Sequence, residues 1–464
     1  MKWLTQALRW SSTLIIARLL TPTDYGLVGM AMVYLGLVQL VNEFGLGSAI
    51  VQRKLDEDQV AQLAGVSAML GLFLFLVSAA ASGLIALIFA EPRVRLVLLA
   101  LSTTFLIRGL QVVPRGLLTR ELKFRLLAGV DAAEAATLTL ATLVLALLGY
   151  GYWALVFSSV LSALVSSLCA LHLRPHRMAL PLRLASLRDS LSFGGHVVLS
   201  RVAWYAYSNA DFAIVGRVLG TAALGAYSFG WSIASIPVER VSATMGRVVM
   251  GVFSSLQDDY PAIRRYLLAL TEGIALLTFP ATVGLSLVAP DFVYVVLGPR
   301  WSAAILPLQL LSLYAGIRSI DTLFPQILLA TGHSRVNMRF SLIAVAVLPA
   351  LFYAGSHWGT TGVAFAWIVG FPLVTLPTNF RYTLRMLGIP ARDYLMALRP
   401  AVNGTLAMAL AVHAVRATIT GPLAPSLRLT VEVAVGAGAY AAVVFLAHGS
   451  RVRAFAAFLR STRR

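Results

Sequence analysis

Long apolar blocks alternate with short charged gaps along the whole chain. Most blocks hold roughly 18–25 residues, the length that a helix needs to cross a bilayer. They predict fourteen transmembrane helices, near residues 3–20, 26–50, 62–90, 95–114, 126–148, 152–173, 190–216, 222–250, 267–289, 302–330, 336–356, 359–380, 398–420 and 428–449. The first is the weakest, because it contains Gln6 and Arg9. No small-residue cleavage site follows it, so a signal peptide is not expected.

Composition supports an all-α polytopic membrane protein. Of the 464 residues, 59% are hydrophobic and 12% charged, and the mean hydropathy is +0.82. A soluble chain of this length carries about a quarter charged residues. The net charge of +18 would suggest nucleic acid in a soluble protein. Here the charges lie between the apolar blocks, so the lipid surface is the expected partner and nucleic acid is not.

The distribution of Lys and Arg predicts the orientation in the membrane. When residues toward the span ends are counted with the neighbouring loop or terminus, the termini and even-numbered loops hold 25 of the 37, the odd-numbered loops hold 7, and five lie deeper within spans. Because positive loops stay in the cytoplasm, both termini are predicted to be cytoplasmic. For a bacterial chain this is the inner membrane. The basic segment before the seventh span and the tail after residue 450, expected to be an amphipathic surface helix, lie on that side.

A segment of the first half of the chain recurs in the second half. Ala17-Arg18-Leu19-Leu20 and Tyr25-Gly26 are echoed 199 residues later by Gly216-Arg217-Val218-Leu219 and Leu224-Gly225. Further matches are Pro114 with Pro325, Gly149 with Gly359 and Ala154 with Ala364. A repeat in an apolar chain indicates two related membrane lobes, as in many transporters. Six helices per lobe place the relating axis along the membrane normal.

The expected domains follow from this repeat. They are an N-terminal six-helix lobe (1–173), a basic cytoplasmic linker (174–189), a second six-helix lobe (190–385), a connector with an appended helix pair (386–449) and a basic cytoplasmic tail (450–464).

Four stretches resemble the recurring motifs of bacterial polysaccharide and oligosaccharide flippases. They are Ala17-Arg-Leu-Leu-Thr-Pro-Thr-Asp-Tyr-Gly26, Glu43-Phe-Gly-Leu-Gly-Ser-Ala-Ile-Val-Gln-Arg53, the second-lobe echo from Gly216 to Tyr227 with Ser254-Ser-Leu-Gln-Asp258, and Gly298-Pro-Arg-Trp301. These flippases belong to the multidrug/oligosaccharidyl-lipid/polysaccharide exporter superfamily, and the resemblance covers most of the chain. Two departures are the short first span and Asn42-Glu43, where an aspartate is common.

The resemblance implies a two-lobed, V-shaped bundle that carries a polyprenyl-diphosphate-linked oligosaccharide to the outer leaflet by alternating access. Capsule, O-antigen or exopolysaccharide assembly would use it, with a polysaccharide polymerase and assembly proteins as further partners. Spans 1, 2, 7 and 8 would line the cleft, and the appended pair would receive the lipid tail.

Charged residues within spans or at their ends, together with aromatic residues of the seventh span, are the candidates for substrate binding. Each charged residue costs about 2.5–3.5 kcal/mol at a helix centre, so it normally faces a cavity or a partner. A diphosphate-sugar headgroup needs cations for phosphate and flat aromatic faces for sugar. The candidates are Arg18, Glu43, Arg108, Arg201, Trp204, Tyr207, Asp211, Arg217, Glu239, Arg240 and Arg247. For each, anchoring or packing is the alternative, and Arg318 with Asp321 is expected to be a structural ion pair.

Motifs of enzymes and of cofactor binding are missing from the sequence. It has no phosphate-binding Gly-rich loop ending in Lys-Ser/Thr, no Gly-x-Ser-x-Gly elbow and no histidines at metal-ligand spacing. No cofactor or metal is expected, and a gradient of H+ or Na+, or of the lipid-linked substrate itself, would supply the energy. Three alternatives remain: a cation-coupled small-molecule exporter of the same superfamily, a membrane polymerase or glycosyltransferase, and a scaffold for an assembly complex.

The two copies of the repeat match at their glycine and arginine positions but differ in their other charged residues. Arg18 and Arg217 occupy equivalent positions, whereas Glu43 aligns with Ser242. Glu239, Arg240 and Arg247 have no charged counterparts at the same offset. We therefore expect substrate recognition where the two lobes differ.

Overall fold

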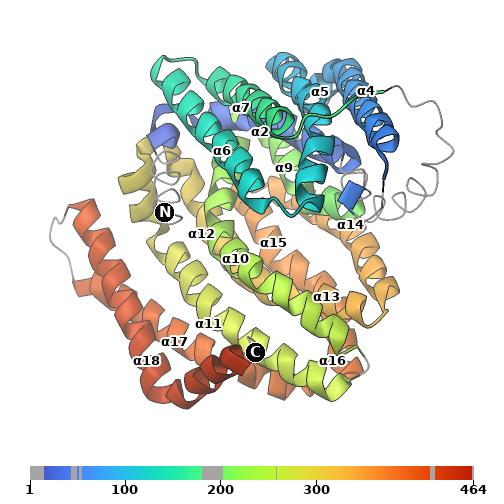
Figure 1. The fold of residues 1–464 in the computed structure, drawn as a ribbon. Helices are drawn as coiled ribbons and strands as arrows, with labels where there is room; N and C mark the ends of the chain where they lie inside the picture. Colours follow the sequence, from blue (N-terminus) through green and yellow to red (C-terminus); the bar gives the residue numbers. More distant parts are fainter. Residues whose placement is uncertain are drawn as a thin grey trace. The chain divides into compact units, whose positions relative to one another are not determined.

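The computed structural model describes residues 15–42, 50–51, 55–179, 202–257, 259–418 and 424–461, and the side chains of 41–42, 242–252 and 452–461 lie outside that description. Every regular element in this part of the chain is a helix (Figure 1). The expectation of an all-α membrane protein is therefore confirmed.

Most of the helices are long enough to cross a bilayer. The first half contains α2 (Pro22–Asn42), α4 (Glu57–Phe89), α5 (Arg93–Arg120), α6 (Phe124–Leu147), α7 (Tyr152–Leu173), α9 (Ala210–Ile214), η2 (Val215–Leu219) and α10 (Thr221–Ser255). The second half contains α11 (Tyr260–Phe292), η3 (Val293–Leu297), η4 (Pro299–Ala304), α12 (Ile305–Asp321), α13 (Leu323–Ala330), α14 (Ser334–Ser356), α15 (Gly359–Thr375), η5 (Leu376–Phe380), α16 (Arg381–Met386), α17 (Ala391–Thr418) and α18 (Pro425–Ser461).

Eleven stretches of the described residues have the length and composition of a membrane span. The predicted spans at 3–20, 190–216 and 222–250 each include residues, or side chains, outside the description, so the count of fourteen stays a prediction.

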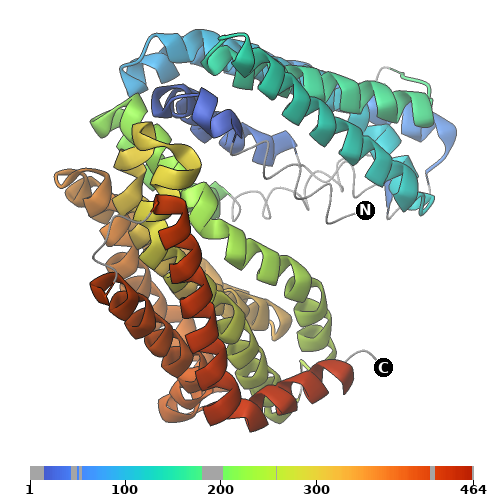
Figure 2. The ribbon, with the colours of Figure 1, turned by 90° about the vertical axis from the view of Figure 1, so that its left-hand side faces the viewer.

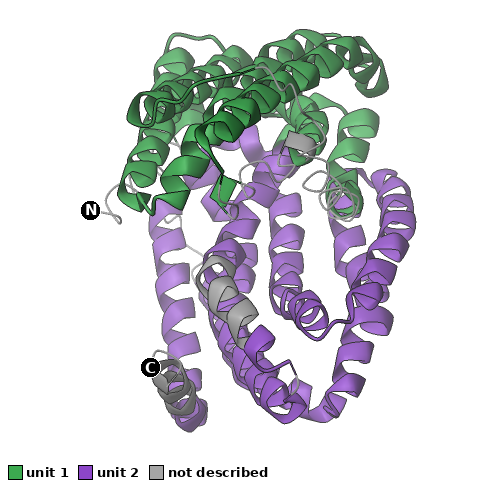
Figure 3. Ribbon diagram, turned by 45° about the vertical axis from the view of Figure 1, so that its right-hand side comes forward, with its two compact units in different colours: residues 1–225 green, residues 226–464 purple. Residues whose placement is uncertain are grey.

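The chain divides into two compact units, residues 1–225 and 226–464 (Figure 3). The division falls inside the continuous helix α10, after its fifth residue. The described residues of 202–225, which the repeat assigns to the second lobe, are therefore grouped with the first unit. The lobes defined by the repeat stay a prediction, because compact packing and ancestral repeats need not share a boundary.

Small residues set the packing in unit 1. Antiparallel α4 and α5 approach closely at Gly71 and Gly109, where a Cβ on Gly71 would lie 2.5 Å from the Phe105 carbonyl oxygen. The Ser67 hydroxyl donates a hydrogen bond to the Gly109 carbonyl across the same interface. Close backbone contact and interhelical hydrogen bonds are how helices associate in lipid, where burial of apolar surface gives no driving force. At the start of α4, Asp56 and Gln59 form a capping box.

Aromatic side chains build the centre of unit 2. The rings of Phe324, Phe380 and Tyr394 pack with centroids 5.1–5.9 Å apart and join α13, η5 and α17. Gly355 and Gly362 let α14 and α15 form a tight hairpin, since a Cβ on Gly362 would meet the Gly355 carbonyl oxygen at 2.1 Å.

The repeat positions have equivalent local structure. Gly149, in the turn before α7, and Gly359, the first residue of α15, both have positive φ, +80° and +68°. This conformation favours glycine because a Cβ would clash with the backbone. Ala154 and Ala364, each five residues after its glycine, are both fully buried. The weak sequence echo therefore corresponds to matching backbone geometry.

A cluster of four charges holds the appended pair α17 and α18 against α11. The Arg416 guanidinium binds both carboxylate oxygens of Glu432, at 2.7 and 2.9 Å, and also donates to the Leu287 carbonyl. Asp291 lies 3.5 Å from Arg416, and Arg428 lies 3.3 Å from Glu432. The Glu432 side chain is fully buried, so its charge depends on these partners.

The appended pair continues into the C-terminal tail through a bend in α18. His448 has non-helical φ and ψ, and the chain changes direction there before continuing as helix to Ser461 (Figure 2). The helical part of the expectation for the tail is confirmed, and its amphipathic contact with lipid stays a prediction.

The Arg416–Glu432 pair gives a test of how α17 and α18 are attached. We expect Arg416→Met to lower the thermal midpoint of unfolding in detergent, because it leaves a buried carboxylate poorly compensated at a cost of about 3–5 kcal/mol. The double variant Arg416→Met/Glu432→Leu should recover much of the loss, because it removes both charges.

The exposed Arg300 provides the control, and Arg300→Met should unfold at the wild-type temperature. An Arg416→Met protein as stable as wild type would contradict the role of the cluster.

Candidate substrate-binding surfaces

Arg18 and Arg217, the echoed arginines, are both exposed in unit 1. Arg217 lies in the π-helix η2, between buried Val215 and Gly216 and the terminating Gly220, which has φ of +87°. A π-turn widens the backbone and is frequent at functional sites of membrane helices. A guanidinium group can bind phosphate oxygens, and the predicted role of these two arginines in binding phosphate stays a prediction.

The three candidates near residues 204–211 differ in how far their side chains are exposed. Trp204 is 45% exposed, whereas Tyr207 and Asp211 are buried at 7% and 3%. The Asp211 carboxylate accepts a hydrogen bond from the Phe212 amide. Of the two aromatic candidates, only Trp204 has a ring that is exposed enough to contact a ligand.

The Tyr205 hydroxyl holds this segment against α2. It donates to the Val33 carbonyl at 3.0 Å and lies over Gly36, where a Cβ would be 2.2 Å from it. Only a residue without a side chain fits there, so Gly36 makes the contact possible.

Arg108 and Arg115 form ion pairs within unit 1. Arg108 donates to Glu134 of α6 at 2.7 Å, and Arg115 donates to Asp131 on the same helix. Between them, Gln111 accepts a hydrogen bond from Ser166 of α7. These polar residues on one face of α5 therefore connect it to α6 and α7. The placement of Arg108 in the cleft stays a prediction, and its charge is already paired with that of Glu134.

Sequence reasoning missed the partners of this stripe. Asp131 and Glu134 stand three residues apart, and Arg108 and Arg115 stand seven apart, so each pair shares one helix face. Matching opposite charges on two consecutive spans was the signal that could have found them.

The charged residues of α10 that have no counterpart in the first copy of the repeat follow a proline. Pro237 lies inside the helix, and Glu239 and Arg240, directly after it, are exposed. Because proline removes one helical hydrogen bond, it favours a bend at this point.

Arg318 lies over an aromatic stack in unit 2. Its guanidinium carbon is 5.4 Å from the centroid of the Trp231 ring, within cation–π range. Trp231 contacts Tyr314, which stacks on Trp367 at 4.6 Å. Asp321 is buried and interacts electrostatically with Arg318. No ion pair of 4.0 Å or less joins the two among the described residues, so the predicted structural pair acts at longer range.

Three candidates cannot be placed. Glu43 and Arg201 lie outside the described residues, as does the side chain of Arg247. Their roles stay predictions.

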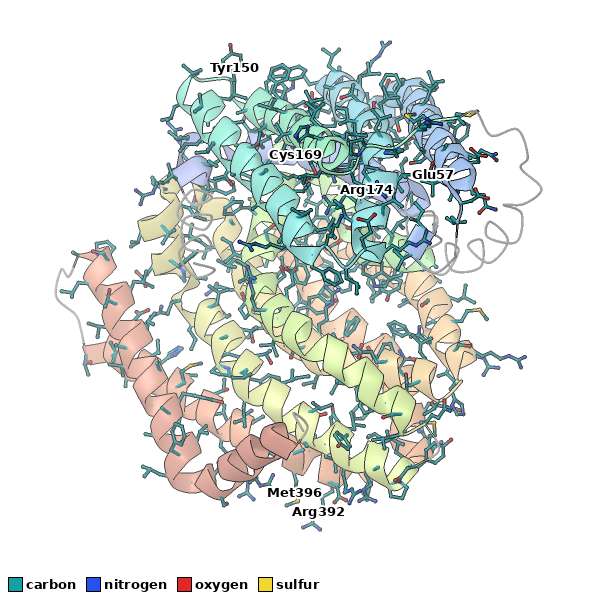
Figure 4. All side chains as sticks on the ribbon, in the orientation of Figure 1. Glu57, Tyr150, Cys169, Arg174, Arg392 and Met396 are labelled. Carbon is teal, nitrogen blue, oxygen red and sulfur yellow. The ribbon has the colours of Figure 1, made fainter. Side chains whose placement is uncertain are left out.

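Glu121 links the α5–α6 turn to the end of α7. Its carboxylate binds Lys123 and Arg174, each at 2.7 Å, and Figure 4 labels Arg174 beyond the end of α7. The hydrogen bond from Lys123, followed by that from Arg174, lowers the pKa of Glu121. Two residues after Arg174, burial lowers the pKa of His176. The described residues contain no group of three His, Cys, Asp or Glu side chains that could hold a metal.

The fold is shared with solved transporters. The lipid II flippase MurJ, in an inward closed conformation, superposes with a TM-score of 0.77 at 14% identity, covering 97% of this chain and 99% of its own. An inward-facing multidrug resistance MATE family transporter of the MOP superfamily gives 0.66 at 16% identity, covering 82% and 94%.

Two curated relatives match over most of their length. The lipopolysaccharide biosynthesis protein WzxC of Escherichia coli (strain K12) is 25% identical over 83% of this chain and 79% of its own. The succinoglycan biosynthesis transport protein ExoT of Rhizobium meliloti (strain 1021) is 28% identical over 97% and 91%.

The helical fold and these likenesses define the class: a multi-pass membrane transporter rather than an enzyme. The model of the polysaccharide biosynthesis protein family matches residues 15–306, and the chain belongs to this family. The resemblance found in its sequence motifs is confirmed.

Charge removal tests the function of Arg108. Arg108→Ala leaves Glu134 unpaired at a cost of about 2.5–3.5 kcal/mol, so we expect less folded protein and less polysaccharide. If Arg108 serves only as a partner, Arg108→Ala/Glu134→Ala restores both quantities, measured by protein yield and glycan output. If it binds substrate, the double variant restores the protein but not the glycan.

Acid should weaken the contact made by Glu121. Because its folded-state pKa is lowered, the ion pair stabilises the fold at neutral pH and is lost as the pH falls through that pKa. We expect Glu121→Gln to lower the free energy of unfolding at pH 7 by about 0.2–1 kcal/mol, the amount typical of a partly exposed pair, and so to lower the thermal midpoint slightly. Below the folded-state pKa the two proteins should unfold together. A difference that grows in acid would contradict this account.

Proposed function

We propose that the protein moves polyprenyl-diphosphate-linked oligosaccharide units from the inner to the outer leaflet of the bacterial inner membrane. The observation that most strongly supports this proposal is the family match over residues 15–306. Relatives whose names place them in lipopolysaccharide synthesis and succinoglycan transport support the glycan class. Both termini would be cytoplasmic, and a polysaccharide polymerase and assembly proteins would act on the product.

The exposed side chains suit the two chemical parts of such a headgroup. A diphosphate requires cations, which Arg18 and Arg217 offer in unit 1 and Arg240 offers in unit 2. Arginine can hold phosphate oxygens through two parallel hydrogen bonds. Sugar rings pack on flat aromatic faces, and the exposed ring of Trp204 provides one. Alternating access would bring these groups to each side of the membrane in turn.

The likeness to MATE transporters favours a second candidate, a cation-coupled small-molecule exporter. The MATE match covers 82% of this chain, whereas the MurJ match covers 97%, so the MATE fold leaves more of the chain unaccounted for. The exposed arginines also fit an anionic substrate better than a cationic drug. We therefore place the exporter second.

A deletion strain tests the proposal. Without this protein, lipid-linked oligosaccharide should accumulate on the cytoplasmic leaflet while surface polysaccharide is lost, because synthesis continues and translocation stops. The measurements are leaflet-resolved labelling of the lipid-linked sugar and quantification of surface glycan.

Complementation with the wild-type gene should reverse both changes, and so should the Arg300→Ala variant as a matched surface arginine. Normal surface glycan combined with increased drug sensitivity would instead establish the exporter.

A further inference from the structure

The first turns of α2 and α10 touch through a pair of glycines in unit 1. A Cβ built on Gly26 would lie 1.7 Å from the Thr221 carbonyl oxygen and 3.0 Å from the Gly225 nitrogen. A Cβ built on Gly225 would lie 1.7 Å from the Pro22 carbonyl oxygen and 2.9 Å from the Gly26 nitrogen. Neither position has room for a side chain, and the contact is backbone on backbone.

The contact is reciprocal and coincides with the sequence repeat. Gly26 and Gly225 are separated by the repeat offset of 199 residues, and so are Pro22 and Thr221. Each glycine therefore meets the carbonyl that corresponds to the one met by its partner, at the same distance. Such exchange of equivalent contacts places a local two-fold axis between the two glycines.

The position in the chain adds a second, independent observation. The boundary between the compact units falls directly after Gly225, inside the unbroken helix α10. The first turn of α10 thus packs with unit 1, and the remaining turns belong to unit 2. The crossing itself lies within unit 1, directly before the point where the chain passes into unit 2.

We propose that the Gly26–Gly225 crossing is the pivot about which the two halves of the protein rock, an inference that rests on the proposed transport by alternating access. A point on the two-fold axis is the one that a symmetric rocking motion leaves in place. Interlocked side chains would have to disengage for helices to rotate past each other. A crossing of bare backbones has no such ridges, so the helices can change their angle while remaining in contact.

A nearby glycine, Gly29, has room for a side chain and therefore provides the control substitution. A Cβ on Gly29, one turn further along α2, would lie 3.4 Å from the Leu224 side chain, an ordinary van der Waals distance. Alanine is therefore tolerated there, but at Gly26 or Gly225 it forces the helices apart. We expect Gly26→Ala and Gly225→Ala each to lower transport on the order of tenfold or more, with Gly29→Ala near wild type.

Distance measurements between spin labels can distinguish a pivot from a contact that only holds the two helices together. In a Cys169→Ser background, spin labels at Thr23 and Ala222 flank the crossing, and labels at Leu37 and Ser232 lie further along the same two helices. All four positions are at least partly exposed. Across conditions that favour inward- and outward-open states, the Thr23–Ala222 separation should stay constant, while the Leu37–Ser232 distance changes.

The Gly26→Ala substitution in the labelled protein should suppress the change at Leu37–Ser232 without altering the elution of a folded protein. A Thr23–Ala222 separation that changes as much as the distant pair would overturn the proposal. So would full motion in the Gly26→Ala protein. These distances need no substrate, so they can fail or succeed independently of the leaflet assay that tests the proposed function.

Discussion

The need to satisfy every polar group without help from water governs this structure. A bilayer offers no partners to backbone or charge, so backbone groups pair within helices and charged side chains pair across them. Arg108 with Glu134 and Arg416 with Glu432 show the rule at work in separate units, where each pair connects consecutive or appended helices. These charges therefore act as connectors of the bundle in addition to any contact with substrate.

Close backbone contact complements the ion pairs. Glycine at positions 71, 109, 355 and 362 lets neighbouring helices approach until carbonyl oxygens face bare Cα atoms. In lipid, this geometry replaces the apolar burial that holds a soluble core together. The crossing at Gly26 and Gly225 uses the same device on equivalent positions of the repeat, which makes it a point of symmetry as well as of packing.

Sequence predicted the fold better than the site, for a physical reason. Apolar block length is dictated by the bilayer, so helices such as α7 were expected at the bounds observed, Tyr152–Leu173. The repeat paired Gly149 with Gly359, and both have positive φ in the structure. Side-chain partners depend on which helices become neighbours, which periodicity does not specify. Glu134 was therefore overlooked, and the Trp231 ring beside Arg318 could not be anticipated from an i, i+3 spacing with Asp321.

The grouping of residues up to 225 with the first unit has a consequence for biogenesis. Helices enter the membrane in order during synthesis, yet α2 relies on Tyr205 to cover Gly36 and on Gly225 to cover Gly26. The first unit therefore cannot complete its packing when its sixth span has been inserted. It must wait in the membrane with part of α2 uncovered until the beginning of the second repeat arrives. A polypeptide ending at the basic linker would lack these two contacts, so the first repeat alone is not a self-sufficient folding unit.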